Sequence, residues 1–234
     1  MAAQAGVAYS LKNPYAYLDS NLTGFLNIVE CSRKFKVKGL IYASSSSVYG
    51  LNKKIPFSID DRVSKPISLY GATKRTNELI ASSYSHLYGL NTTGLRYFTV
   101  YGPWYRPDMA MFKFASSISK NKTIKIFNNG KINRDFTYID DIVNGTKSAI
   151  NKNFKSEIFN LGNNKSINIM EVVGLIEKEY GVKAKIKFLP KKAGDMDNTF
   201  ADINYTQKKL NYNPKIDVSV GIPRLINWFK EYYK

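Results

Sequence analysis

Hydrophobic positions along the chain follow two patterns, short continuous apolar runs and longer segments with three- and four-residue spacing. Residues 39–44 form a nearly continuous apolar run, which is typical of a buried parallel strand, and we expect further strands over 92–98, 157–161 and 184–189. The spaced segments are typical of amphipathic helices, and they predict helices over 21–35, 69–88, 141–151, 168–180 and 219–232. Gly89 and Gly181 follow two of these helices, where a glycine commonly ends a helix.

The order of these elements predicts the fold class. Strands and helices alternate, which indicates an α/β fold with a parallel sheet covered on both faces. Ligands of such sheets bind at the carboxyl ends of the strands. In this chain those positions follow Ala43, Phe98 and Leu161.

Composition narrows the class of protein. A length of 234 residues suits one or two domains, and 44% hydrophobic with 23% charged residues excludes wholesale disorder. The chain has no run of 18 apolar residues and no basic-then-apolar leader. We therefore expect a cytoplasmic protein with no membrane partner.

Charge and the rare residue types exclude further classes. The formal net charge is +17, but the two halves of the chain share it evenly, so we expect no nucleic-acid partner. A single cysteine, Cys31, excludes a disulfide framework. With His86 as the one histidine, we also expect no metal site built on Cys or His.

Candidate chemistry lies after the first strand. Ser44–Ser47 follows it directly, and Tyr70 and Lys74 lie one turn apart at the start of the next helix. A nearby ammonium favours the phenolate form of a tyrosine, which can then act as a general base. The spacing alone is weak evidence, because two other pairs share it: Tyr49/Lys53 and Tyr205/Lys209. The serine cluster at a strand end distinguishes the first pair.

With these motifs the chain resembles the extended short-chain dehydrogenase/reductase superfamily and, within it, the UDP-glucuronate 4-epimerases. The matching segments are collinear: 2–7, 42–50, 68–74, 84–90, 92–104, 106–110 and 134–141. The resemblance implies a Rossmann-like, doubly wound parallel sheet, N-terminally truncated here, with a small C-terminal α/β substrate-binding region. It places the C-terminal part of the NAD-binding domain at 1–102 and the substrate-binding region mainly at 103–234, with 134–162 returning to the Rossmann sheet.

The resemblance also implies roles for the residues at the strand ends. Tyr70 is the expected catalytic base, Lys74 holds the nicotinamide ribose and tunes Tyr70, and Ser45 bonds the reacting sugar oxygen. Ser44 and Phe98 are expected to line the nicotinamide end of NAD.

Further residues match substrate-binding positions. Ser46 and Thr99 are expected near the sugar, and Asp195 near the uridine ribose. Arg106 and Arg134 match arginines that face the diphosphate or the uronic acid, anions suited to forked guanidinium donors.

Three other charged positions are more typical of structural roles. Arg96 is expected to brace a strand, and His86 to be a packed helix residue. Asp140–Asp141 is expected to form a helix N-cap.

The sequence departs from the family in its dinucleotide site. It contains no Gly-x-x-Gly-x-x-Gly turn after a strand and no acidic residue at the following ribose position. The family's first three strands and most of the fourth lie upstream of the matching region, so we expect little or no activity from the chain as given. Smaller departures are Ala8, where the epimerases usually have Arg, and Tyr105, where they usually have Gly.

The resemblance implies an NAD-dependent conversion of UDP-glucuronate to UDP-galacturonate, in a homodimer paired through helices matching 21–35 and 72–88. Another UDP-hexose or UDP-N-acetylhexosamine 4-epimerase is the first alternative. A dTDP-glucose dehydratase is disfavoured, because those enzymes carry Asp-Glu where this chain has Ser46-Ser47. The alternative of another class is a non-catalytic remnant, or one half of a split enzyme, that binds UDP-sugar.

Overall fold

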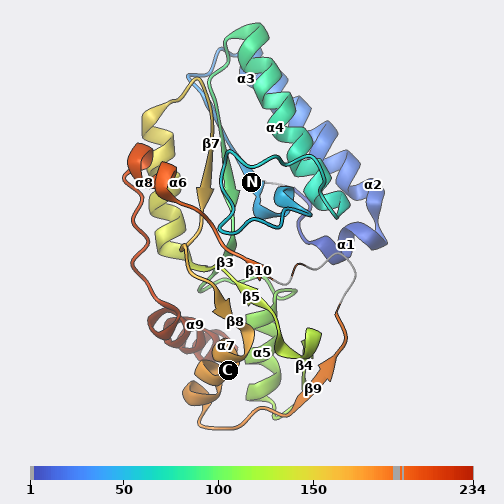
Figure 1. Cartoon of the computed structure of the whole chain (residues 1–234), viewed down its shortest axis with the longest axis vertical. Coiled ribbons are helices and arrows are strands. Elements are labelled where there is room, and N and C mark those ends of the chain that lie inside the picture. The colour runs from blue at the N-terminus through green and yellow to red at the C-terminus, as the bar shows by residue number, and fades with distance from the viewer. Residues whose placement is uncertain (1–2, 192–195, 197, 234) are drawn as a thin grey trace. The chain divides into compact units, whose positions relative to one another are not determined.

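The computed structural model describes residues 3–191, 196 and 198–233, and it divides into two compact units (Figure 1). The first unit comprises Met1–Phe98, Asn144–Leu161 and Ala201–Tyr212. The second comprises Thr99–Val143, Gly162–Phe200 and Asn213–Lys234.

The first unit is built on a three-stranded parallel sheet in the order β1-β2-β7. Its elements are α1 (Val7–Lys12), α2 (Pro14–Tyr17), the π-helix η1 (Leu18–Thr23), α3 (Gly24–Lys34), β1 (Leu40–Ser45), the 3-10 helix η2 (Ser46–Tyr49), α4 (Leu69–Tyr88), β2 (Thr92–Tyr97), β7 (Ser156–Leu161) and α8 (Asn204–Leu210). The helix α6 (Ile139–Lys152) begins in the second unit and ends in the first.

Helices cover both faces of this sheet, as a doubly wound fold requires. On one face the ring of Tyr42 in β1 meets Phe25 of α3 at 5.3 Å between centroids, and α4 packs beside α3 (Figure 1). On the other face the hydroxyl of Tyr97 in β2 hydrogen bonds Thr146 of α6 at 3.0 Å.

The second unit combines three helices with small sheets. Its elements are β3 (Thr99–Tyr101), α5 (Ala110–Ser119), β4 (Ile124–Phe127), the 3-10 helix η3 (Asn128–Gly130), β5 (Asn133–Arg134), β6 (Phe136–Tyr138), β8 (Ile167–Asn168), α7 (Ile169–Tyr180), β9 (Ile186–Leu189), β10 (Asn198–Thr199) and α9 (Val218–Tyr232). The strands pair as β10-β5-β8, β3-β6 and β4-β9. Apolar faces of the helices form one core, which includes Met111 of α5, Val172 of α7 and Ile222 of α9.

The predicted fold class is confirmed, and several predicted elements lie where the pattern placed them. The helix over 69–88 matches α4 residue for residue, and the three predicted central strands form one parallel sheet. The pattern missed α1, α2, α5 and α8. The helix predicted from residue 21 begins at Gly24, because the wider turn η1 precedes it.

Two structural expectations are wrong and one is confirmed. The Asp141 carboxylate accepts hydrogen bonds from the N–H groups of Lys215 and Ile216, so it anchors a distant segment and does not cap its own helix. His86 is exposed on α4 instead of packed. Arg96 does brace its strand, as described below.

The boundaries between the two units differ from the boundary predicted at residue 102. The second unit begins at Thr99, because β3 pairs with β6. Residues 201–212 belong to the first unit, where Tyr205 of α8 stacks on Phe159 of β7 at 5.5 Å between ring centroids.

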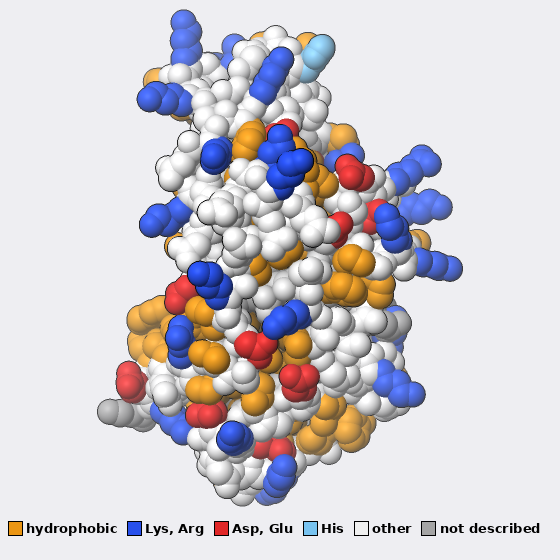
Figure 2. Space-filling model, turned by 60° about the vertical axis from the view of Figure 1, so that its left-hand side comes forward, with side chains coloured by type: hydrophobic (Ala, Val, Ile, Leu, Met, Phe, Trp, Pro, Cys, Tyr) orange, Lys and Arg blue, Asp and Glu red, His pale blue; other side chains and the backbone are white. Residues whose placement is uncertain are grey.

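Surface features agree with the even charge distribution of the sequence. On the face drawn in Figure 2, Lys and Arg side chains are spread over much of the surface, with several close together at the right-hand edge, and acidic groups lie among them. None of the helices in the described ranges is long and apolar enough to cross a membrane.

A buried ion pair joins α4 to the sheet of the first unit. The Glu78 carboxylate accepts hydrogen bonds from Nε and Nη2 of Arg96 in β2, at 2.8 and 2.9 Å, and both side chains are almost fully buried. Arg75 donates a further hydrogen bond to Glu78 at 2.8 Å. The remaining Arg96 nitrogen, Nη1, donates to the hydroxyl of Tyr49, which donates in turn to Asn160 of β7. Since Ser44 of β1 also donates a hydrogen bond to Glu78, the cluster around the pair connects one helix with all three strands of the sheet.

The electrostatics of this pair favour both charged forms. Burial alone would raise the pKa of Glu78, but the hydrogen bonds and charge of Arg96, with the hydrogen bonds of Ser44 and Arg75, hold that pKa below its ordinary value. Burial likewise opposes the charge of Arg96, and its hydrogen bonds to Glu78 raise the pKa of the guanidinium.

We expect Glu78→Gln to lower the free energy of unfolding by about 3–5 kcal/mol, because it leaves the buried Arg96 charge without its counter-ion. A group with a lowered folded-state pKa stabilises fully above its unfolded pKa and loses that effect as pH falls. Wild-type stability should therefore decline below about pH 4.5, the ordinary value for Glu78, more steeply than that of the variant. Urea unfolding at several pH values measures both effects.

The matched control is Glu30→Gln on α3. Glu30 also pairs with an arginine, Arg33 at 2.9 Å, but on the surface. Glu30 also accepts a hydrogen bond from the Tyr84 hydroxyl of α4, so its substitution should lower the urea midpoint, but much less than Glu78→Gln does, because partly exposed ion pairs contribute little. Equal losses for the two variants would contradict the role given to the buried pair.

The outer edge of β1 generates a second prediction. In the described part of the chain β1 pairs with β2 alone, and its Leu40, Ile41 and Ala43 are only half-buried. An unpaired parallel strand is a template for association with other chains. We expect the purified chain to self-associate heterogeneously in size-exclusion chromatography with light scattering. A monodisperse monomer with one sharp cooperative unfolding transition would show that this edge does not promote self-association.

Candidate functional site

The predicted serine cluster forms a tight turn at the carboxyl end of β1. Ser44 and Ser45 are buried at the end of the strand, and the half-buried Ser46 opens η2. The Ser45 hydroxyl accepts a hydrogen bond from the N–H of Ser47 at 3.1 Å, which caps η2. The turn is therefore held by its own side chains.

The start of α4 approaches this turn closely. Ser68 caps the helix by accepting a hydrogen bond from Gly71 N–H at 3.0 Å. A Cβ atom added to Gly71 would lie 2.6 Å from the backbone oxygen of Ser47, so only glycine allows this approach. Tyr70, the residue before Gly71, is thereby held at the serine turn.

Tyr70 and Lys74 both contact their surroundings from α4. Tyr70 is half-buried, and its ring meets the ring of Tyr17 edge-on at 6.2 Å. Lys74 is 5% exposed, and its Nζ donates a hydrogen bond to the carbonyl oxygen of Ala43 at 3.0 Å. Burial lowers the pKa of the Lys74 ammonium. The structure thus brings Ser44, Ser45, Tyr70 and Lys74 together at the end of β1.

The structure gives the Ser44 side chain a partner that the sequence did not indicate. Its hydroxyl donates a hydrogen bond to the Glu78 carboxylate at 2.6 Å, in the buried cluster with Arg96. Glu78 lies four residues after Lys74 and eight after Tyr70, so the three side chains share one face of α4. This spacing on one helix face is the feature of the sequence from which a role for Glu78 could have been predicted.

Phe98 lies at the corresponding end of β2. Its side chain is 6% exposed, and its N–H donates a hydrogen bond to the carbonyl of Leu161 in β7 at 3.0 Å. Its ring is 6.2 Å from that of Tyr49, the hydroxyl of which takes part in the buried cluster. Phe98 therefore helps to hold the carboxyl ends of β2 and β7 together.

Apart from Ser45 and Ser46 of the first unit, the predicted substrate residues belong to the second unit. Thr99 and Arg134 line a cavity of about 720 Å³, and Asp108 lines it too. Arg106 makes a two-pronged ion pair with Asp108, at 2.9 and 2.6 Å, and both groups are largely exposed. Asp195 lies outside the described residues.

The cavity of the second unit combines cations with aromatic and apolar walls. Its charged lining residues are Asp108, Lys113, Lys125 and Arg134. Its wall also includes Tyr105, Phe114, Phe127 and Phe136. Such a lining suits a ligand with a flat ring and anionic groups, because rings stack on aromatic faces and guanidinium groups bind phosphate.

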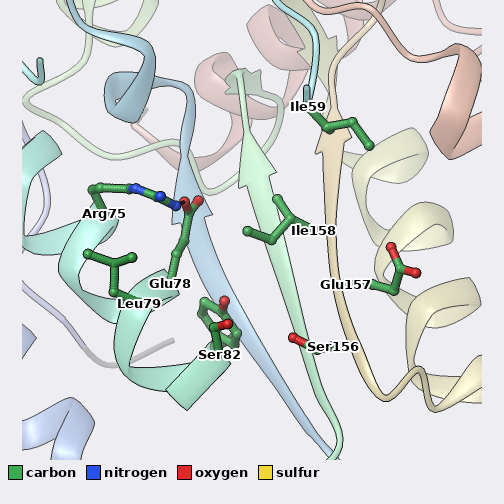
Figure 3. Close-up of a pocket in the computed structure, with 9 residues that line it drawn as sticks. Ile59, Arg75, Glu78, Leu79, Ser82, Ser156, Glu157 and Ile158 are labelled. Carbon is green, nitrogen blue, oxygen red and sulfur yellow. Dashed lines mark hydrogen bonds and ion pairs between the residues drawn. The ribbon is translucent and has the colours of Figure 1, made fainter. Parts of the chain in front are cut away.

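A smaller cavity of about 280 Å³ lies in the first unit between α4 and the sheet (Figure 3). Arg75 and Glu78 of α4 form an ion pair in its wall, and Leu79, Ile59 and Ile158 supply apolar side chains. None of the predicted site residues lines it.

The residues at the end of β1 fit the nicotinamide end of a dinucleotide. The Lys74 ammonium can donate to ribose hydroxyls, since among the described residues its one hydrogen bond is to Ala43. The pyrophosphate normally rests on a glycine-rich turn at a helix N-terminus, which the printed sequence does not contain.

Comparison with known proteins agrees with this geometry. The family model for the NAD dependent epimerase/dehydratase family matches residues 1–162. UDP-glucuronate 4-epimerase 5 of Arabidopsis thaliana is 45% identical over 251 residues, which cover 100% of this chain and 58% of that protein. The chain thus spans under two thirds of the length of this plant relative.

Solved structures share the fold closely. UDP-glucuronic acid 4-epimerase of Bacillus cereus, solved with UDP-glucuronic acid and NAD, has a TM-score of 0.95 at 34% identity, covering 100% of this chain and 74% of that one. UDP-glucose 4-epimerase of Thermotoga maritima, solved with UDP-glucose, has a TM-score of 0.95 at 29% identity, with 100% and 77% covered. The family match over more than half of the residues, together with these likenesses, shows that the chain belongs to the NAD dependent epimerase/dehydratase family.

Proposed function

We propose that the chain is the catalytic and substrate-binding part of an NAD-dependent UDP-glucuronate 4-epimerase. The observation that carries the proposal is the cluster of Ser45, Tyr70 and Lys74 at the end of β1, fixed by the approach of Gly71 to Ser47. The Arabidopsis and Bacillus relatives named for UDP-glucuronate support the substrate.

The proposed chemistry exchanges a proton at the sugar hydroxyl on C4. Tyr70 accepts this proton, and the adjacent Lys74 ammonium favours its phenolate form. Ser45 holds the same oxygen by a hydrogen bond at the strand end. When bound, NAD supplies the acceptor and donor of the C4 hydride. Tyr70 then returns the proton, so no group of the chain is consumed.

The second unit is proposed to hold the UDP-sugar. Arg134, Lys113 and Lys125 line its cavity and complement a diphosphate and a uronate carboxylate, while the aromatic wall suits uracil. Thr99 also lines the cavity, as proposed for a residue near the sugar. The likeness to the Thermotoga UDP-glucose 4-epimerase favours another UDP-hexose as the second candidate substrate.

The assay compares the chain as printed with a chimera that adds the nucleotide-binding segment of the Bacillus cereus relative. With UDP-glucuronate and NAD, we expect UDP-galacturonate from the chimera and at most trace turnover from the chain alone. Turnover of UDP-glucose but not UDP-glucuronate by the chimera would select the second candidate. Full turnover by the chain alone would contradict the proposed need for a glycine-rich segment.

In the chimera we expect Tyr70→Phe to lower kcat by about 10²–10⁴-fold, because it removes the proton acceptor while the ring still packs. Ser45→Ala should act on the same proton, so the double variant should lose far less than the product of the single losses. Steady-state kinetics of the three variants measure this coupling.

Tyr205→Phe is the matched control, because Tyr205 also precedes a lysine by four residues but lies on α8. Its hydroxyl donates to Glu157 at 2.8 Å, away from the end of β1. Its activity should stay within about twofold, because the phenylalanine ring can still stack on Phe159 and the lost hydroxyl lies away from the end of β1. Near-full activity of Tyr70→Phe, or an equal loss in the control, would remove Tyr70 from the role of base.

A homodimer through α3 and α4 is part of the proposal. These helices pack together and expose apolar side chains: Leu26, Phe35, Leu79, Leu87 and Tyr88. Exposed apolar side chains gathered on neighbouring helices mark association surfaces. We expect the chimera to be a dimer by light scattering and the double variant Leu79→Glu/Leu87→Glu to be a monomer. A chimera that remains monomeric at every concentration would exclude this interface.

A further inference from the structure

The segment that forms one wall of the second unit's cavity has an unusual backbone. Residues 102–109 lead from β3 to α5, and Tyr105, Asp108 and Met109 line the cavity. Trp104, next to Tyr105, has a φ of 63°, in the left-handed region that bulky residues rarely adopt. Such a conformation persists only where the surroundings determine it.

The Trp104 ring contacts aromatic side chains of α9. The Trp104 ring lies 4.9 Å from the ring of Tyr232 and 5.5 Å from that of Trp228. Trp228 and Tyr232 are one turn apart on α9 and stack on each other at 5.5 Å with an interplanar angle of 21°. The Trp104 side chain nevertheless remains 71% exposed, so ring contacts rather than burial fix it.

The same cluster is connected to the opposite end of the cavity wall. Trp228 contacts the ring of Phe229, and Phe229 contacts Phe112 of α5 at 5.2 Å between centroids. The helix α5 contributes Lys113, Phe114 and Ser117 to the cavity. Trp104 itself does not line the cavity, whereas Tyr105 does. Trp104 therefore contacts α9 on one side of the segment, and Tyr105 lines the cavity on the other.

We propose that Trp104 is a positioning residue for nucleotide binding: its ring, held by Trp228 and Tyr232, fixes the backbone that carries Tyr105 and Asp108 into the cavity. This inference rests on the proposed UDP-sugar function of that cavity. If the cavity wall is competent only while these ring contacts, here called the clamp, are made, the apparent Kd equals the intrinsic Kd divided by the fraction of molecules in the clamped conformation. Occupancy of the cavity must also alter the environment of the clamp, because the coupling is reciprocal.

The chain carries its own probe for this coupling, because its two tryptophans are the two indoles of the clamp. We expect UDP, titrated into the wild-type chain, to change the tryptophan fluorescence with a midpoint equal to the calorimetric Kd. Calorimetric binding of UDP without a fluorescence change would overturn the inference and leave the proposed function standing. Absence of UDP binding to the wild-type chain would overturn the proposed function and, with it, this inference.

Three substitutions separate the ring from the backbone. Trp104→Ala should weaken UDP binding about tenfold, while Trp104→Phe, which keeps an aromatic ring, should restore it to within about twofold. Trp104→Gly relieves the left-handed strain but has no ring, so we expect it to bind as poorly as the alanine variant. Wild-type affinity in the alanine or glycine variant would overturn the proposal.

Tyr232→Ala is the test from the other side of the clamp. It leaves Trp104 in place but removes its nearest ring, and it should also weaken UDP binding. Ser219→Ala, near the other end of α9 and remote from the rings, is the control and should bind as the wild type does. Equal affinities for the Tyr232 and Ser219 variants would overturn the clamp.

Discussion

The candidate site depends on the buried ion pair between Glu78 and Arg96. Arg96 belongs to the middle strand of the sheet in the first unit, and Glu78 to the helix that carries Tyr70 and Lys74. The Glu78 carboxylate also accepts the Ser44 hydroxyl, so one pair of charges fixes the end of β1, the middle strand and α4 together. Removal of Glu78 leaves the Arg96 charge buried without a counter-ion, and removal of Arg96 leaves Glu78 with only Arg75 and Ser44 as partners among the described residues, which makes this arrangement difficult to deform.

Lys74 differs from the ion pair, because its burial lowers the stability of the fold while its position suits the proposed function. Its ammonium is buried with a backbone carbonyl as its hydrogen-bond partner, and this burial lowers its pKa. A buried cation without a carboxylate destabilises the folded state at neutral pH. The nearby Glu78–Arg96 pair and the capped start of α4 hold the helix in place despite this cost. A position that is costly for the fold but suited to ribose hydroxyls and a phenolate is typical of functional sites.

Much of the first unit could be predicted from local patterns. The strand after Gly39 is a nearly continuous apolar run, and α4 has a serine cap and a terminal glycine, Gly89, so the ends of these elements could be predicted. The pair of Tyr70 and Lys74 was found because a serine-rich strand end precedes it. The partner of Arg96 could not be assigned, because which carboxylate meets it depends on how α4 packs on the sheet. Ser44 illustrates the same limit, since its hydroxyl donates to Glu78.

The second unit was harder to predict for physical reasons. Strands such as β5 and β8 have two residues each, too few for a hydrophobic period to develop. The left-handed backbone of Trp104 has no local signature either, and the rings that Trp104 contacts, Trp228 and Tyr232, lie more than a hundred positions later in the chain. Ligand-binding segments of this kind are defined by tertiary contacts, whereas the sheet is defined by its own sequence.

Amide hydrogen exchange tests most directly whether the buried pair holds the candidate site together. The comparison is between the wild-type chain and Glu78→Gln, under conditions where both are folded. If the pair fixes the site, exchange in the variant should accelerate in three segments at once: residues 40–49, 69–78 and 92–97, while α5 of the second unit remains unchanged. Exchange that accelerates only around residue 78, or not at all, would contradict the account.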